Sequence, residues 1–291
     1  PRRTQFIPDP GELDIEDLID DEELIFAMTS AGYVKTMALS DFNAQGRGGK
    51  GVTGAKLKDE DALSHMIHTT AHAYLLFFSN KGKVYRLKAH EIPSASRTAR
   101  GTPIVNLLPL HPDERIQAVV DTRDYETNRF LFFATKNGRV KKTLFTAYDS
   151  SLKAGLIAIK LNEGDELVSV VPTNGSDHIF LVSSMGQTLR VDEEKIRSMG
   201  RTAAGVNGMK FRVDDYLVSC AVSEEEAMLL HLTTEGFGKR TEVEEFSVKG
   251  RGGLGVRGIK TTENRGTVAG ALIVKGDDDI LAVTSSGKII R

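Results

Sequence analysis

The sequence predicts an all-β, propeller-like fold, because one pattern recurs six times along the 291 residues. Each copy has an apolar run, a polar turn that carries glycine, and a second short run. The runs are rich in Val, Ile, Leu, Phe and Thr, which favour pleated strands. About four strands fill each period of roughly 50 residues, the content of one propeller blade. The turn glycines, spaced by 50, 56, 48, 50 and 51 residues, are Gly32, Gly82, Gly138, Gly186, Gly236 and Gly287.

Each repeat opens with a predicted hairpin, in which glycine supplies the positive φ that a short turn requires. A solenoid or a row of sandwich hairpins would show a similar repeat, but four short strands per period favour a closed radial array. The six hairpins are predicted over 24–39, 75–89, 131–145, 179–193, 229–243 and 280–291.

A second glycine follows each turn glycine at a nearly constant offset of 19, 19, 17, 19 and 19 residues. A short apolar stretch comes next, as in 155–161, and then an acidic turn with a further strand, as in 165–171. The sixth copy stops at Arg291, so we expect the last blade to be truncated and the chain to be part of a longer protein. The second glycines are Gly51, Gly101, Gly155, Gly205 and Gly255.

Charge is segregated along the chain, although the formal net charge is only −2. Residues 1–23 hold nine acidic residues against Arg2 and Arg3, a local net charge of −7. The remaining 36 basic and 31 acidic residues give residues 24–291 a net charge of +5. An acidic leader before a mildly basic body indicates a surface that binds polyanions.

Several function classes are disfavoured by composition. The single cysteine, Cys220, cannot form an internal disulfide, which favours a reduced, cytoplasmic setting. No apolar run approaches the ~20 residues of a membrane span, and the N-terminus has no signal-peptide core. His65, His68 and His72 have no cysteine or paired carboxylate converging with them in sequence, so we expect no metal site.

Two glycine-rich stretches, 45–51 and 249–255, contain G-x-G-x-x-G. A dinucleotide site would need a helix after this motif, but no helix-forming run follows Gly51. A Walker A loop fails as well, because Lys50 precedes glycine rather than Ser or Thr. Two interpretations remain: a flexible loop with incidental charge, or a loop whose amides approach phosphates while Arg47 and Lys50 supply charge.

Basic residues occur in two fixed registers. The first lies four residues before the second glycine; only the third repeat departs, with Ser151 there and Lys153 nearby. The second follows the turn glycine by three or four residues. Because equal offsets map to equal places on each blade, we expect a belt of charge along which duplex DNA could wrap. The two registers comprise Arg47, Arg97, Arg201 and Arg251, and Lys35, Arg86, Lys141, Lys142, Arg190, Lys239, Arg240 and Arg291.

Residues 45–51 resemble the box Gln-(Arg/Lys)-Arg-Gly-Gly-Lys-Gly found in the A subunits of DNA gyrases, and residues 24–291 resemble their C-terminal DNA-wrapping domain. Among type IIA topoisomerases, this box marks gyrase rather than topoisomerase IV. The first copy departs at Gly46, where a basic residue is usual, and the second has Lys249 for Gln and Leu254 for Lys. Doubled boxes resemble those of actinobacterial gyrases.

The resemblance implies a six-bladed β-pinwheel, in which blades exchange strands and DNA bends around the rim. It implies that residues 1–23 form a linker after a coiled coil, and that the domain supports ATP-dependent negative supercoiling without catalysing a step itself. The family's DNA-cleaving tyrosine follows an arginine, whereas none of the six tyrosines here does. ATP and Mg²⁺ would belong to the whole cytoplasmic enzyme, a heterotetramer of two A and two B subunits that acts on duplex DNA.

Two other functions stay open: a topoisomerase IV-like C-terminal DNA-binding domain, and a protein-binding β-propeller scaffold. The predicted box residues are Gln45, Gly46, Arg47, Gly48, Gly49, Lys50 and Gly51. The predicted DNA contacts are Lys35, Arg47, Lys50, Lys83, Arg86, Arg97, Arg139, Lys141, Lys142, Arg190, Arg201, Lys239, Arg240 and Arg251.

Overall fold

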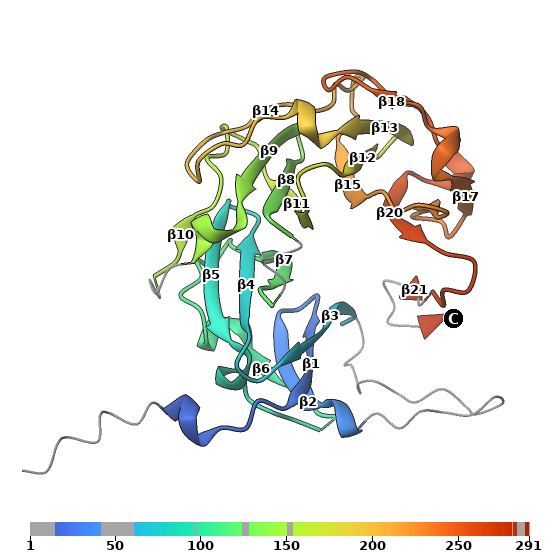
Figure 1. Cartoon of the computed structure of the whole chain (residues 1–291). Coiled ribbons are helices and arrows are strands. Elements are labelled where there is room, and N and C mark those ends of the chain that lie inside the picture. The colour runs from blue at the N-terminus through green and yellow to red at the C-terminus, as the bar shows by residue number, and fades with distance from the viewer. Residues whose placement is uncertain are drawn as a thin grey trace, which may run out of the picture.

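The computed structural model is a series of β-sheets that follow one another around an arc (Figure 1). It describes residues 15–41, 61–96, 98–123, 128–149, 154–280, 282–283 and 289–290. Helical structure in these ranges is limited to 3₁₀ turns of three or four residues. The prediction of an all-β, propeller-like fold is confirmed.

Five sheets form blades that share one plan. Each has an antiparallel hairpin, whose first strand also pairs with an inner strand that follows later in the chain. The hairpins are β1 (Glu23–Thr29) with β2 (Tyr33–Ala38), β4 (Tyr74–Ser79) with β5 (Lys83–Lys88), β8 (Phe130–Thr135) with β9 (Arg139–Leu144), β12 (His178–Ser183) with β13 (Gln187–Asp192), and β16 (Met228–Thr233) with β17 (Gly238–Glu242). The inner strands, which face the inside of the arc in Figure 1, are β3 (Leu63–Thr70), β7 (Ile116–Asp121), β11 (Leu167–Thr173), β15 (Leu217–Val222) and β20 (Val268–Val274).

The predicted sixth repeat forms less structure than the other five. After the fifth blade, the described residues contribute one pair of two-residue strands, β21 (Ala282–Val283) and β22 (Ile289–Ile290). Five blades are therefore present in the described part of the chain, and a complete sixth blade stays a prediction.

Neighbouring blades exchange strands at their outer edges. The repeat that follows each of the first four blades supplies a short strand to the second strand of that blade's hairpin. An uncovered edge would present unpaired N–H and C=O groups, so the exchange completes each sheet and ties adjacent repeats together. The exchanged strands are β6 (Thr102–Pro103) on β2, β10 (Leu156–Ile157) on β5, β14 (Val206–Asn207) on β9, and β18 (Val248–Lys249) with β19 (Val256–Arg257) on β13.

The exchange explains why two glycines recur in each period. Gly186, with φ +80°, lies under the segment from the next repeat, and a Cβ there would approach the Ile259 carbonyl oxygen to 2.4 Å. Gly255, with φ +72°, sits on the other side of this junction, where a Cβ would lie 2.4 Å from the Thr188 carbonyl oxygen. Both positions need positive φ and a close backbone approach, which glycine alone provides cheaply.

The hydrophobic core lies between adjacent blades. Edge-to-face aromatic pairs join the first blade to the second and the fourth to the fifth: Phe26 with Phe77, ring centroids 5.6 Å apart, and Phe180 with Phe246, 5.4 Å apart. Because a neighbour covers each face of an internal blade, its strands are apolar on both faces. This is why they form continuous apolar runs rather than an alternating pattern.

We expect Gly186→Ala to destabilise the domain far more than Gly164→Ala does. Both glycines have positive φ, +80° and +73°, so both variants bear about 1–2 kcal/mol for left-handed backbone. Nothing lies within 4 Å of a Cβ on Gly164, whereas one on Gly186 must displace the backbone of Ile259, just after the exchanged strand, which adds about 1–3 kcal/mol. Chemical denaturation of both variants measures the difference. Equal losses would show that the junction is not tightly packed.

Candidate nucleic-acid interface

The predicted box lies outside the described residues. This applies to Gln45, Gly46, Arg47, Gly48, Gly49, Lys50 and Gly51, and also to Arg97 and Arg291. The roles assigned to these residues therefore stay predictions. The remaining predicted contacts divide into buried, half-buried and exposed side chains.

Three lysines of the second basic register, Lys35, Lys141 and Lys142, are buried rather than exposed on a belt. Lys35, which is 4% exposed, donates to the carbonyl oxygens of Ser96 and Ala99 at 3.1 and 3.0 Å. Lys141, which is 0% exposed, donates to the carbonyl oxygens of Ala158 and of Arg201, the latter at 2.7 Å. The ammonium groups of Lys35 and Lys141 thus each hold the exchanged segment of the next repeat, because buried cations require such partners.

Burial also changes the ionisation of Lys35 and Lys141. It lowers the pKa of Lys35, and together with the nearby charge of Arg201 it lowers the pKa of Lys141 to about 7. Both ammonium groups face carbonyls inside a junction. The structure thus corrects the predicted exposure of these two lysines on a belt, and their contact with DNA stays a prediction.

The basic residue four places after the turn glycine reaches the 3₁₀ turn of the next blade. Arg190 donates to the Val243 carbonyl oxygen at 2.9 Å, at the start of η7 (Val243–Glu245). Arg86 stacks 3.7 Å from the centroid of the Tyr74 ring and pairs with Asp149, which directly follows η5 (Phe145–Tyr148). In the second, third and fourth blades equal offsets do map to equal places, but at this register the place is a contact between blades.

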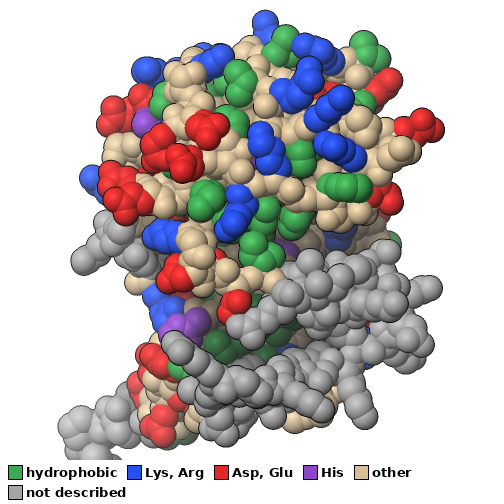
Figure 2. All heavy atoms as spheres, turned by 90° about the vertical axis from the view of Figure 1, so that its right-hand side faces the viewer, with side chains coloured by type: hydrophobic (Ala, Val, Ile, Leu, Met, Phe, Trp, Pro, Cys, Tyr) green, Lys and Arg blue, Asp and Glu red, His purple; other side chains and the backbone are tan. Residues whose placement is uncertain are grey.

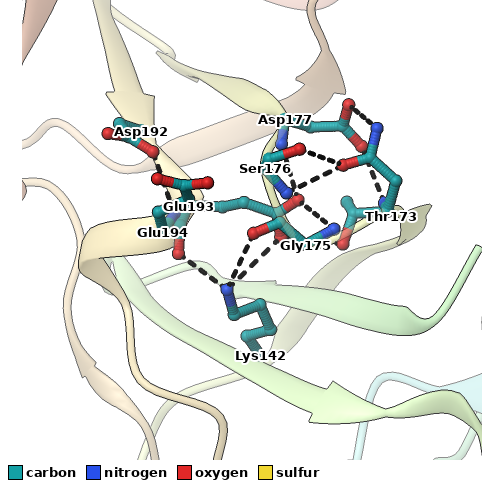
Figure 3. Close-up of polar contacts among 9 residues, drawn as sticks. Lys142, Thr173, Gly175, Ser176, Asp177, Asp192, Glu193 and Glu194 are labelled. Atoms are coloured by element: carbon teal, nitrogen blue, oxygen red, sulfur yellow. Dashed lines mark hydrogen bonds and ion pairs between the residues drawn. The ribbon is translucent and has the colours of Figure 1, made fainter.

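Lys142 makes the most elaborate of these contacts, shown in Figure 3. Its ammonium donates to the Glu193 carbonyl oxygen at 2.9 Å, at the start of η6 (Glu193–Lys195), and lies 4.0 Å from a Glu193 carboxylate oxygen. That carboxylate is fully buried and accepts from the Thr173 hydroxyl at 2.8 Å and from the amides of Gly175 and Asp177 at 2.8 and 2.9 Å. The network joins the third blade to the fourth, so Lys142 is also removed from the predicted belt.

The other predicted contacts lie nearer the surface. Lys83 and Arg201 are half-buried, and Arg139 is half-buried with its guanidinium donating to the Ala204 carbonyl oxygen at 3.1 Å. Lys239, Arg240 and Arg251 are exposed. Lys239 donates to the Gly258 carbonyl oxygen at 3.0 Å, and Arg251 to that of Asn207 at 3.2 Å.

Sequence reasoning missed a further row of lysines. Lys160, Lys210 and Lys260 are exposed, and each stands five residues after the second glycine of its repeat. The residues just before them cross the hairpin turn of the preceding blade, where the amides of Ile159, Met209 and Gly258 donate to the turn glycines Gly82, Gly138 and Gly186 at 3.1, 3.1 and 2.9 Å. The row therefore places one exposed cation beside each of three consecutive turns. The constant offset was the available signal.

The space-filling view shows that basic side chains gather on part of the surface. Figure 2 looks onto the side of the arc that carries β17 and β18, and Lys and Arg side chains cluster over its upper part. The surface is suited to binding a polyanion through charge.

Within the described ranges, no three His, Cys, Asp or Glu side chains are grouped as metal ligands would be, and no helix is long and apolar enough to span a membrane.

We expect the burial of Lys141 to make stability rise with pH. Its pKa is about 7 in the folded protein and 10.5 in the unfolded chain, so between these values only the unfolded chain binds the proton. Unfolding then becomes costlier as pH rises, by up to about 1.4 kcal/mol per pH unit, whereas below pH 7 both states are protonated and the slope vanishes. Denaturant titrations from pH 7 to 9.5 should show this slope in the wild type relative to Lys141→Met. Parallel curves for the two proteins would contradict it.

Comparison with known proteins assigns the chain to a family. A family model described as DNA gyrase C-terminal domain, beta-propeller, matches residues 23–70, 73–122, 129–174, 177–224 and 227–275. The DNA gyrase A subunit of the actinobacterium Mycolicibacterium smegmatis is 44% identical over 292 residues, covering 100% of this chain and 35% of that protein. The chain thus spans about a third of the length of the curated relatives it matches.

Two solved structures share the fold. The crystal structure of the C-terminal domain of DNA topoisomerase IV superposes with a TM-score of 0.77 at 30% identity, covering 94% of this chain and 84% of that one. The structure of the DNA gyrase A C-terminal domain gives a TM-score of 0.73 at 28% identity, covering 91% and 88%. By the family model and the whole-chain likeness to gyrase A subunits, this protein belongs to the DNA gyrase C-terminal domain family.

Proposed function

We propose that this domain binds duplex DNA along the turn side of its arc and bends it there, as the DNA-wrapping part of a gyrase. The observation that carries the proposal is the row of Lys160, Lys210 and Lys260, which places one exposed cation at the same position on three consecutive blade junctions. Cations repeated along a curved surface attract successive phosphates of one backbone and so favour a bent duplex.

The chemistry of the row fits binding without sequence preference. Lysine ammonium groups are compact point charges on flexible stems, so they can attract phosphates of any base sequence. Bending costs on the order of 1–6 kcal/mol for a site of 20–30 base pairs turned by 40–90°. Such a cost requires contacts on several blades at once, which a repeating array supplies.

The box completes this proposal. Arg47 and Lys50, with the glycines around them, would hold the DNA where the wrap closes, beside a sixth blade that completes the ring. Residues 1–23 would link the domain to the rest of the gyrase A polypeptide, in a cytoplasmic assembly of two A and two B subunits. ATP and Mg²⁺ would act on those other parts. The gyrase A names of relatives that match the whole chain support this assignment.

Two alternatives predict different behaviour. A topoisomerase IV-like domain would bind DNA without trapping positive supercoils. This chain shares the fold of such a domain. A protein-binding scaffold would bind DNA weakly, if at all, even at low salt. Relaxing a plasmid with the domain bound and reading the sign of the trapped supercoils distinguishes all three functions.

We expect DNA affinity to depend strongly on duplex length and on salt. Duplexes longer than ~40 base pairs engage several blades and should bind far better than those of 15 base pairs. If about 6–10 phosphates are neutralised, affinity should fall ~10³–10⁵-fold between 50 and 200 mM salt. Gel-shift titrations measure both effects. Equal affinity per site for 15- and 60-base-pair duplexes, or a preference above ~100-fold for one sequence, would contradict the proposal.

We expect Arg47→Ala with Lys50→Ala to abolish wrapping while sparing much of the binding. Two lost charges should reduce the salt slope by only ~2, because many roughly equivalent cations supply the affinity. In the intact enzyme the double variant should lose negative supercoiling but keep relaxation and cleavage. A supercoil-trapping assay beside a binding titration tests this. Wrapping that survives while binding collapses would make the box an ordinary phosphate contact.

A further inference from the structure

A groove between the fourth and fifth blades concentrates basic side chains. It consists of two adjoining pockets of ≈ 360 and ≈ 460 Å³ that share Arg257, Ile259 and Lys260. One pocket extends to Arg212, and the other to Lys239 and Arg265. Five cations thus surround one groove, and no Asp or Glu is among the described residues that line it.

The strand exchange brings these cations together from both blades. Arg257 stands on β19, opposite Gln187 of the fourth blade, and the next residue donates its amide to Gly186 at 2.9 Å. Lys239 reaches across from β17 of the fifth blade to the Gly258 carbonyl oxygen at 3.0 Å. Arg265 ends η8 (Glu263–Arg265), just before the innermost strand of the fifth blade.

The fifth repeat also lacks an acidic residue that the other four carry near the turn. In those repeats the residue two places before the inner strand is Asp61, Glu114, Asp165 or Asp215. Asp215, for example, accepts the amide of Met185 in the fourth hairpin turn at 2.9 Å.

In the fifth repeat this position is Gly266, with φ +70°, and Arg265 precedes it. The Arg265 guanidinium lies 5.7 Å from the centroid of the Phe237 ring, which is 48% exposed. The fifth repeat therefore has no carboxylate at this position and a cation directly before it, although the turn itself carries Glu235.

We propose that this groove is the anchor at which the domain holds the DNA backbone most tightly. The inference rests on the proposed DNA-wrapping function and adds that the strength of DNA binding differs along the arc. Arginine forks bind phosphate oxygens in pairs, and a groove with walls of one charge sign focuses the field on an entering anion. The exposed Phe237 ring offers an apolar surface against which a deoxyribose can pack.

The first test compares two double variants that each remove two exposed positive charges. Arg257→Gln with Lys260→Gln empties the centre of the groove, and Lys160→Gln with Lys210→Gln removes two members of the lysine row on other blades. Both should reduce the salt slope for a ~60-base-pair duplex by about 2. At fixed salt, the groove pair should raise Kd on the order of tenfold more than the control pair, because arginine contacts to phosphate are charge-assisted and bidentate. Equal losses would overturn the anchor. Failure of the wild type to bind DNA would instead overturn the proposed function.

A second measurement removes one cation at each of the two places and compares how firmly each place holds DNA. Cys220, the only cysteine in the sequence, is buried and burial raises the pKa of its thiol, so Lys260→Cys and Lys160→Cys each offer one reactive site for a fluorophore. As salt rises, the DNA-dependent signal of the dye at position 260 should persist to higher concentration than that of the dye at position 160. Loss of both signals together would show that the groove holds DNA no more tightly than the rest of the row.

Discussion

The exchanged strand is the contact on which the rest of this structure depends. Each of the first four blades leaves the outer edge of its hairpin open, and the next repeat fills it with strands of only two residues. So short a strand adds few ladder hydrogen bonds, and the segment around it must be held by other means. The means are the two positive-φ glycines that permit close approach and the cations that bind its carbonyl groups, such as Lys35 and Lys141.

This arrangement explains how far the sequence predicts the fold. Periodic glycines and apolar runs correctly predicted the propeller-like class and the hairpins and inner strands of five blades. The same periodicity misled the interpretation of Lys35, Lys141 and Lys142, because an equal offset shows only that residues occupy equivalent places. Whether that place faces solvent depends on partners about 60 residues away in the chain, such as Arg201 for Lys141, and local pattern does not identify them.

At the candidate site the error is the opposite, because exposed lysines were missed rather than buried lysines predicted to be exposed. Lys160, Lys210 and Lys260 have no unusual neighbours in sequence, and each follows an apolar stretch that is easily interpreted as a plain strand. They become exposed because the residues just before them bind the turn glycine of the preceding blade, which turns the following side chain out of the junction. A sequence aligned by its second glycines, rather than its turn glycines, would have grouped them. The box residues could be recognised by resemblance, and their geometry lies outside the described residues.

The distinction between buried and exposed cations also explains why a formal net charge near zero is compatible with a basic surface. A buried ammonium paired with a carboxylate, as Lys142 is with Glu193, contributes little field at the rim, and a buried lysine offers no ammonium to a phosphate, so the count of basic residues says little about DNA binding. What matters is where a carboxylate is missing. In a repeat array each unit contacts only its neighbours, so one repeat can lose its acidic residue without disturbing distant blades. The fifth repeat has done so at one position, where Gly266 replaces the acid and Arg265 precedes it. The architecture therefore permits charge, and with it DNA affinity, to differ from one blade to the next while the fold stays the same.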